Sequence, residues 1–259
     1  MNAGNVFRAY DIRGVVDKDF NAEWVTHLGK ACGTYLAGRG ISSAVIGYDC
    51  RHSSPAYHDA LVEGILSTGT DIISIGMVPT PALYFAVKHL NRQGGVMITA
   101  SHNPPEYNGY KVYWEDGAQF TPPHDKGVTE EVMAITDLST VKTMGAQEAK
   151  AKGLYEIIGA AIDDKYIAQV KAQVVNQGAI DRMQDQITIV YTPLHGTGNI
   201  PARRVMKELG FTHVYVVPQQ ELPDGDFPTV SYPNPEAKEA FELGLALAKE
   251  KNADLVLAT

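Results

Sequence analysis

Cysteine is scarce in this sequence: among its 259 residues only Cys32 and Cys50 carry a thiol. The two have no metal-ligand spacing, and a single pair is not the framework of a disulfide-stapled scaffold. We therefore expect free thiols, buried in the folded chain, as is usual in a reducing compartment.

Long apolar runs are also missing, and no stretch approaches the roughly 18 residues of a membrane-spanning helix. Residues 1–8 lack the basic and apolar regions of a signal peptide. The net charge of −8 argues against a general surface for nucleic acids or anionic membranes, although a few cations in one cleft could bind a small anion. We expect a cytoplasmic protein without nucleic-acid or membrane partners; its oligomeric state is not indicated.

What is present is a globular composition, 44% hydrophobic and 20% charged, in a chain long enough for two small domains. Strands and helices alternate in the first half, which indicates an α/β fold with a largely parallel sheet. The expected strands are 44–47, 71–75 and 96–99, with 111–114 returning antiparallel. Helices are expected to begin at Asn21, Ser54 and Thr80, the last with Leu83, Tyr84 and Val87 facing inward.

The second half repeats this order after a polar stretch, 138–153, that loses the apolar period and is predicted to be a surface connection. Its expected strands are 187–191, 214–217 and 253–259. Its expected helices are one capped by Asp163 with Tyr166, Val170 and Val174 inward, one opened by Pro201, and one opened by Pro235 with Phe241, Leu245 and Ala248 inward. The matching order indicates a structural duplication. We predict two similar three-layer α/β/α domains with mixed, largely parallel sheets, at residues 1–140 and 161–259, joined by a linker at 141–160.

The most informative stretch is residues 96–111, where a short buried strand leads into the sequence TASHNPP. Ser101, His102 and Asn103 then occupy a loop whose exit is fixed by Pro104 and Pro105. In open α/β sheets, ligands bind at the carboxyl ends of strands. The alternative is an ordinary turn with a surface serine.

The residues around this loop resemble a known family. TASHNP at 99–104 is similar to the phosphoserine signature of the α-D-phosphohexomutases, the phosphoglucomutase/phosphomannomutase superfamily. Further matching segments are FRAYDIRG at 7–14, YDCRHSS at 48–54, VPTP at 78–81, YNGYKVY at 107–113, YTPLHGTG at 191–198, FPTV at 227–230 and PNPE at 233–236. The family has four domains, of which the first three share one α/β fold, so the chain resembles domain 1 and most of domain 2.

The resemblance implies an intramolecular phosphotransferase, classed as an isomerase, that interconverts hexose 1-phosphate and hexose 6-phosphate. Ser101 would carry the phosphoryl group, giving it to the sugar and recovering it from a bisphosphate intermediate. Arg13 would hold the phosphate with forked hydrogen bonds, and Lys111 would be the general acid/base for the sugar hydroxyl. His102 would contact the phosphoryl site, and Arg51, beside His52, would shape the loop or bind substrate.

Two cofactors are implied by the same resemblance: Mg²⁺ and a hexose 1,6-bisphosphate activator. Mg²⁺ would bind Ser101 through its phosphoryl oxygen, together with aspartates of a loop expected to begin directly after Thr259. We expect that the chain ends before this metal-binding loop, and that the 259 residues alone have no turnover.

Several alternatives stay open. Within the superfamily the sugar could be glucose, mannose, glucosamine or a pentose. Outside it, Ser101 could belong to a serine hydrolase or a phosphatase, although the Gly-x-Ser-x-Gly pattern of a nucleophile elbow is missing. The isolated chain could also be a non-catalytic phosphosugar-binding fragment. The loop at His195 could cradle a phosphate or be a structural turn, and the second is favoured because the P-loop lysine is missing.

Overall fold

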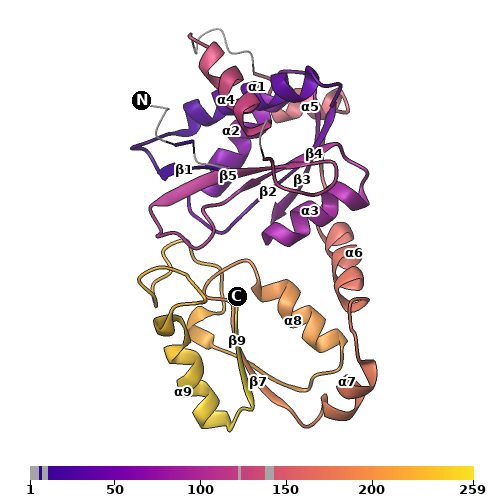
Figure 1. Ribbon diagram of the computed structural model, residues 1–259, viewed down its shortest axis with the longest axis vertical. Coiled ribbons are helices and arrows are strands. Elements are labelled where there is room, and N and C mark those ends of the chain that lie inside the picture. Colours follow the sequence, from indigo (N-terminus) through magenta and orange to yellow (C-terminus); the bar gives the residue numbers. More distant parts are fainter. Residues whose placement is uncertain (1–5, 8–10, 122–123, 138–142) are drawn as a thin grey trace. The chain divides into compact units, whose positions relative to one another are not determined.

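The computed structural model describes residues 6–7, 11–121, 124–137 and 143–259, without the side chains of His124 and Asp125. The chain folds into two compact units, seen in Figure 1. Unit 1 comprises Met1–Ala100 and Glu106–Gly159, and unit 2 comprises Ser101–Pro105 and Ala160–Thr259. Arg8, Ala9 and Tyr10 of the N-terminal motif lie outside the described residues.

Unit 1 is built on a six-stranded sheet with the order β1-β5-β4-β2-β3-β6. Strands β2, β3, β4 and β6 are parallel, and β5 runs antiparallel to both β4 and β1. The strands are β1 (Ile12–Val15), β2 (Ser43–Tyr48), β3 (Asp71–Met77), β4 (Gly94–Ile98), β5 (Tyr107–Trp114) and β6 (Tyr155–Ile157). The sheet is therefore mixed and mostly parallel, as the alternation of strands and helices predicts.

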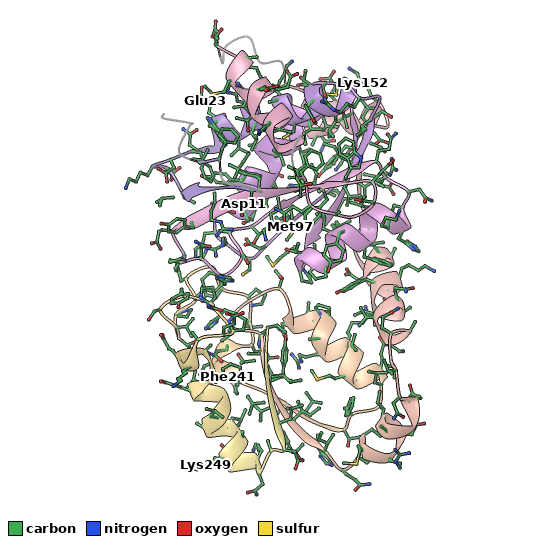
Figure 2. The ribbon with its side chains drawn as sticks, viewed as in Figure 1. Asp11, Glu23, Met97, Lys152, Phe241 and Lys249 are labelled. Carbon is green, nitrogen blue, oxygen red and sulfur yellow. The ribbon has the colours of Figure 1, made fainter. Side chains whose placement is uncertain are left out.

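Helices cover both faces of this sheet. Helices α1, α2, α4 and α5 lie on one face and α3 lies on the other (Figure 1). Their bounds are α1 (Ala22–Ala37), α2 (Ser54–Leu66), α3 (Thr80–His89), α4 (His124–Ala134) and α5 (Ala146–Ala151). Side chains of the sheet and of α1 and α2 interleave to form the main apolar core, which Figure 2 shows as the densest region of sticks in unit 1.

Two glycines allow α1 and α2 to pack with their backbones in contact. A Cβ atom on Gly64 would lie 2.2 Å from the carbonyl oxygen of Thr26, and one on Gly29 would lie 2.4 Å from that of Leu61. No side chain fits at such distances, so the two helices approach as closely as their backbones permit.

Unit 2 has a three-stranded parallel sheet with the order β8-β7-β9. Helices α8 and α9 lie on opposite faces of it (Figure 1). The elements are α6 (Ala160–Lys171), α7 (Gln177–Met183), β7 (Thr188–Thr192), α8 (Asn199–Glu208), β8 (His213–Val216), two 3₁₀ turns (Pro218–Gln220 and Lys238–Phe241), α9 (Glu242–Lys251) and β9 (Leu255–Ala258). None of the helices described in either unit is long and apolar enough to cross a membrane.

The two units share a topological core. In unit 1, β2 lies between β3 and β4, and in unit 2, β7 lies between β8 and β9, with all neighbours parallel. The first strand of each set is thus central, with the second on one side and the third on the other. This is the correspondence that the duplicated sequence pattern predicts.

Residues 141–160 are not a plain linker. Of these, 141 and 142 lie outside the described residues, but Ala146–Ala151 forms α5 and Tyr155–Ile157 pairs with β3 as an edge strand of unit 1. The apolar period is lost here because α5 is short and buries only Ala149, and because β6 exposes two of its three residues.

Several inward faces also differ from prediction. Tyr84 is 40% exposed and Leu245 is 57% exposed, whereas both were expected to face the core. In α6 the buried residues are Ile162 and Ile167, not the expected stripe of Tyr166, Val170 and Val174. Short helices with few apolar residues leave the choice of buried face to tertiary packing, which a sequence period does not contain.

His58 joins α2 to the sheet through a buried polar contact. Its Nε2 lies 2.8 Å from Ser74 Oγ on β3, its Nδ1 lies 2.9 Å from the Asp59 carboxylate, and its side chain is buried. Burial lowers the pKa of this imidazole, an effect that the adjacent Asp59 opposes. The folded chain therefore holds His58 neutral more firmly than the unfolded chain does.

The helix contact can be tested with Gly64→Ala. We expect the variant to lower the free energy of unfolding by roughly 1–3 kcal/mol, because the new methyl group forces α1 away from α2. Urea unfolding followed by tryptophan fluorescence reports on unit 1, since both tryptophans, Trp24 and Trp114, lie there. Gly145→Ala is the control, because a Cβ atom at Gly145 meets nothing within 4 Å. Equal stability of the two variants would contradict the close contact.

The buried histidine predicts a pH dependence. Since the folded-state pKa of His58 is lowered, the unfolded chain binds its proton first as pH falls below about 6.5, and stability decreases from there downward. The His58→Gln variant should lose less stability than the parent chain between pH 7.5 and pH 5.5 in urea unfolding. His213→Gln, at an exposed position, is the control, and an unchanged slope in His58→Gln would refute the assignment.

Candidate active site at the carboxyl end of the first sheet

Ser101 directly follows the buried end of β4. All five residues of β4 are buried, as are Thr99 and Ala100, and the chain then becomes exposed at Ser101 and His102. Ser101 has φ +55°, in the left-handed region that side-chain-bearing residues seldom adopt. Such strained positions concentrate at functional sites. The strand therefore leads into an exposed serine on a sharply turned backbone.

The position of this loop in the topology favours ligand binding. The chain leaves β2 toward β3 on one side and returns to β4 on the other, so the strand order reverses between β2 and β4. Their parallel carboxyl ends lead into residues 49–53 and 99–105. Ligands of open α/β sheets bind at such a switch point.

Arg13 and Lys111 lie on the same face of the sheet. Arg13 in β1 pairs with Gly109 in β5, and Lys111 is two residues further along β5. Partners across antiparallel strands share a face, as do alternate residues within one strand. The backbone N–H of Thr99 donates to the carbonyl of Gly109 at 2.9 Å. The residue directly after β4 therefore lies opposite Gly109. Two cations thus flank the glycine beside which the serine-bearing strand ends.

Gly109 is required for this arrangement. A Cβ atom there would lie 2.3 Å from the carbonyl oxygen of Ile12, 3.1 Å from that of Thr99 and 3.3 Å from Arg13 Cα. The glycine thus lets β1 and the end of β4 close on β5 from both sides. Any larger residue must move the strand that carries Arg13.

Arg13 is held by Asp11, with Nη2 of the arginine 2.5 Å from the carboxylate. Its side chain is 29% exposed. A carboxylate that anchors one side of a guanidinium orients its remaining N–H groups, and those groups suit a phosphate.

Arg51 has a different environment from the other cations. It is 1% exposed, its Nη1 donates to the carbonyl of Tyr107 at 2.9 Å, and its Nε lies 3.2 Å from Asp49. Burial lowers the pKa of this guanidinium, and the charge of Asp49 opposes the shift. The next residue, His52, is exposed. Arg51 thus ties the loop after β2 to the start of β5.

The loop residues after the serine differ in exposure. His102 is exposed, and Asn103, Pro104 and Pro105 are half-buried. Of the five residues singled out from the sequence, Arg13 and Lys111 share one face of the sheet, and Arg51 is engaged with the backbone of β5. Ser101 and His102 are on the loop that β4 enters.

Three residues beside this site, Asp49, Asn108 and Gly109, were quoted in motifs but given no role by sequence reasoning. A sequence signal could have found them. Each is a polar residue or a glycine at a position, in a strand or directly after it, where an apolar residue is usual. Asn108 and Gly109 lie within β5, and Asp49 follows β2 directly.

The loop after β7, the central strand of unit 2, also contains strained residues. Leu194 and His195 both have positive φ, +48° and +60°. His195 is buried, and its Nε2 lies 2.9 Å from Thr229 Oγ1, which also accepts from Gln220. Burial lowers the pKa of this imidazole. These contacts favour a structural turn over a phosphate cradle.

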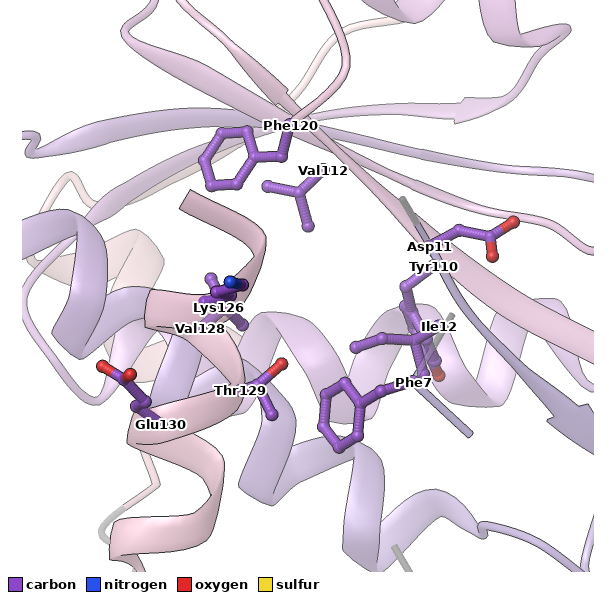
Figure 3. Close-up of a pocket in the computed structure, with 10 residues that line it drawn as sticks. All are labelled: Phe7, Asp11, Ile12, Tyr110, Val112, Phe120, Lys126, Val128, Thr129 and Glu130. Carbon is purple, nitrogen blue, oxygen red and sulfur yellow. The ribbon is translucent and has the colours of Figure 1, made fainter. Parts of the chain in front are cut away.

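Unit 1 also contains a cavity of about 330 Å³ on the opposite face of the sheet from Arg13 and Lys111. Residues of β1, β5 and α4 line it, and in Figure 3 the Asp11 carboxylate points away from the apolar lining. Its lining residues are Phe7, Asp11, Ile12, Tyr110, Val112, Phe120, Lys126, Val128, Thr129 and Glu130. The cavity is largely apolar and is not part of the candidate site.

Two family models match the chain. The model described as phosphoglucomutase/phosphomannomutase, alpha/beta/alpha domain I, matches residues 4–139, and the model for domain II matches residues 164–259.

Individual proteins give the same picture. The phosphomannomutase/phosphoglucomutase of Pseudomonas aeruginosa is 31% identical over 254 residues, 98% of this chain and 50% of that protein. The phosphoglucomutase of Staphylococcus saprophyticus is 34% identical over 219 residues, 84% of this chain and 39% of that protein. The chain thus spans about half the length, or less, of these curated relatives.

A solved structure, that of a phosphoglucomutase/phosphomannomutase family protein from Burkholderia thailandensis, has a TM-score of 0.78 and 27% identity to this chain. The match covers 98% of this chain and 52% of that one.

The role of Gly109 can be tested with Gly109→Ala. We expect the variant to lose roughly 1–3 kcal/mol of stability, because the methyl group has only backbone atoms to displace. The backbone amide resonance of Arg13 should move more than those of α1. Gly159→Ala, where a Cβ atom meets nothing within 4 Å, should change neither. An unperturbed Arg13 amide in Gly109→Ala would show that the glycine does not set the strand spacing.

Proposed function

This chain belongs to the phosphoglucomutase/phosphomannomutase family, and from that membership we propose that the protein interconverts a hexose 1-phosphate and a hexose 6-phosphate. Glucose and mannose are the proposed sugars, because both appear in the names of its relatives. The observation that carries the proposal is the strained, exposed Ser101 at the end of β4, with Arg13 and Lys111 on one face of the adjoining strands.

The proposed reaction moves one phosphoryl group at a time. A sugar hydroxyl attacks the phosphorus of phosphorylated Ser101, the bond between phosphorus and the serine oxygen breaks, and a hexose 1,6-bisphosphate forms. The serine oxygen then attacks the other phosphate of the bisphosphate, which restores the phosphoserine and releases the isomeric monophosphate. Splitting the transfer in this way is covalent catalysis.

Each cation has a part in this proposal. Lys111 takes the proton from the attacking hydroxyl and returns it to the leaving oxygen. Arg13, oriented by Asp11, neutralises the charge of the transferring phosphoryl group, since this chemistry depends mainly on positioning and electrostatics. His102 donates a hydrogen bond at the phosphoryl group, and Arg51 shapes the neighbouring loop.

Mg²⁺ has a limited place in the proposal. When bound to a phosphoryl oxygen on Ser101 it would neutralise developing negative charge. Asp49, the carboxylate directly after β2, is engaged on both oxygens by Ser54 and Arg51, so it does not fit as a ligand. No step is therefore derived through the metal. The two free thiols suit a cytoplasmic location.

The proposal is tested with the natural protein at full length in coupled assays for glucose 6-phosphate and mannose 6-phosphate. Ser101→Ala should lower kcat by at least about a thousandfold, because the phosphoryl carrier is lost. Ser42→Ala, at an exposed position, should match the parent. Incubation with hexose 1,6-bisphosphate should add about 80 Da to the parent and nothing to Ser101→Ala.

Two results would contradict the proposal. Normal interconversion by Ser101→Ala would exclude the phosphoserine route. Release of inorganic phosphate as the main product would favour a phosphatase.

A further inference from the structure

A buried polar network at the start of β5 has no part in the proposed chemistry. Its centre is Asn108, which is 0% exposed. The Asn108 carboxamide donates to Ser53 Oγ at 2.8 Å and to Ser54 Oγ at 3.0 Å, and it accepts from the backbone N–H of Gly109 at 2.8 Å. Both of its donors are therefore satisfied inside the protein.

The network continues through the loop after β2 and returns to β5. Ser54 Oγ donates to Asp49 at 2.6 Å, and the backbone N–H of Arg51 donates to the same carboxylate oxygen at 3.0 Å. The Arg51 guanidinium contacts the other oxygen and also donates to the carbonyl of Tyr107 at 2.9 Å. Two consecutive residues, Tyr107 and Asn108, are thus bonded to the same loop.

These hydrogen bonds act at the start of β5. They fix the point where the chain re-enters the sheet after the Ser101 loop, one residue before Gly109. Gly109 in turn lies between Arg13 and the end of β4. A chain secured here has one register, and a shift by one residue would turn Lys111 to the opposite face.

We propose that Asn108 is a positioning residue for phosphoryl transfer, acting through Ser54 and the Asp49–Arg51 pair to fix Arg13 and Lys111 on one face of the sheet at the end of β4. The inference rests on the proposed mutase function. An apolar side chain of similar size would fill the same space, but it would not fix the direction of the neighbouring chains. Hydrogen bonds are directional, and the polar network provides them. A misplacement of about 1 Å in such a site can cost about a hundredfold in rate.

The test compares three variants in the full-length protein. Asn108→Leu removes every hydrogen bond of the amide at similar volume. Asn108→Asp keeps the acceptor for Gly109 and can accept from the serine hydroxyls. Ser54→Ala removes the hydroxyl that accepts from Asn108 and donates to Asp49, but it leaves the bonds of Asn108 to Ser53 and Gly109. It serves if Asn108→Leu does not fold. Leu61→Val, a core change in α2 away from the network, is the control for a general loss of stability.

We expect Asn108→Leu to lower kcat at least tenfold while KM for the hexose phosphate stays within about twofold, because Asn108 does not touch substrate. Asn108→Asp should recover part of kcat, and Ser54→Ala should show a smaller loss of kcat with unchanged KM. All variants are assayed at a temperature where each is fully folded by circular dichroism.

The outcomes separate the two proposals. The positioning role alone would be overturned if kcat in Asn108→Leu and Ser54→Ala were no lower than in Leu61→Val. In that case Ser101→Ala would still have lost activity. A rise in KM equal to the loss in kcat/KM would also overturn it, since it would indicate a substrate contact. Activity retained in Ser101→Ala would overturn the proposed function itself.

Discussion

The register of β5 between β4 and β1 is the constraint on which the candidate site depends. It brings Gly109 level with Thr99 on one side and with Arg13, which is distant in the sequence, on the other. Because a strand alternates its faces with a period of two, this single alignment also decides that Lys111 shares the face of Arg13. The missing side chain of Gly109 allows the three strands to close to this spacing.

Polar groups secure this alignment at some energetic cost. Asp49, Arg51 and Asn108 are all buried, and burying such groups is favourable only when their hydrogen bonds are made. Here they are made largely with one another and with the backbone of β5. The strained backbone of Ser101 is a second local cost at the same end of the sheet. Both features fall where the topology places ligands.

The two units show how one topology can serve different loops. Each has its first parallel strand in the centre of its set. Strained residues follow two strand ends, Ser101 after β4 and Leu194 and His195 after β7. After β4, Ser101 and His102 are exposed. In unit 2 the histidine is buried and bonded to Thr229, so that loop is packed into its own unit.

The sequence by itself determined the α/β class, the order of the three parallel strands in each half, the duplication and the residues of the serine loop. These follow from local patterns: apolar runs of strand length, capping residues such as Asn21, and turn residues such as Gly69 and Pro104. The resemblance in the motifs also identified the family, which the comparisons confirm.

Only the tertiary structure decided which residues meet. The edge strand β6, the buried face of α6, the exposure of Tyr84 and the network around Asn108 all depend on partners distant in the chain. A local pattern records the period of a helix or strand but not its neighbour across the sheet. For that reason the serine loop was predicted from the sequence, whereas the contacts of Asn108 and Gly109 with distant parts of the chain were not.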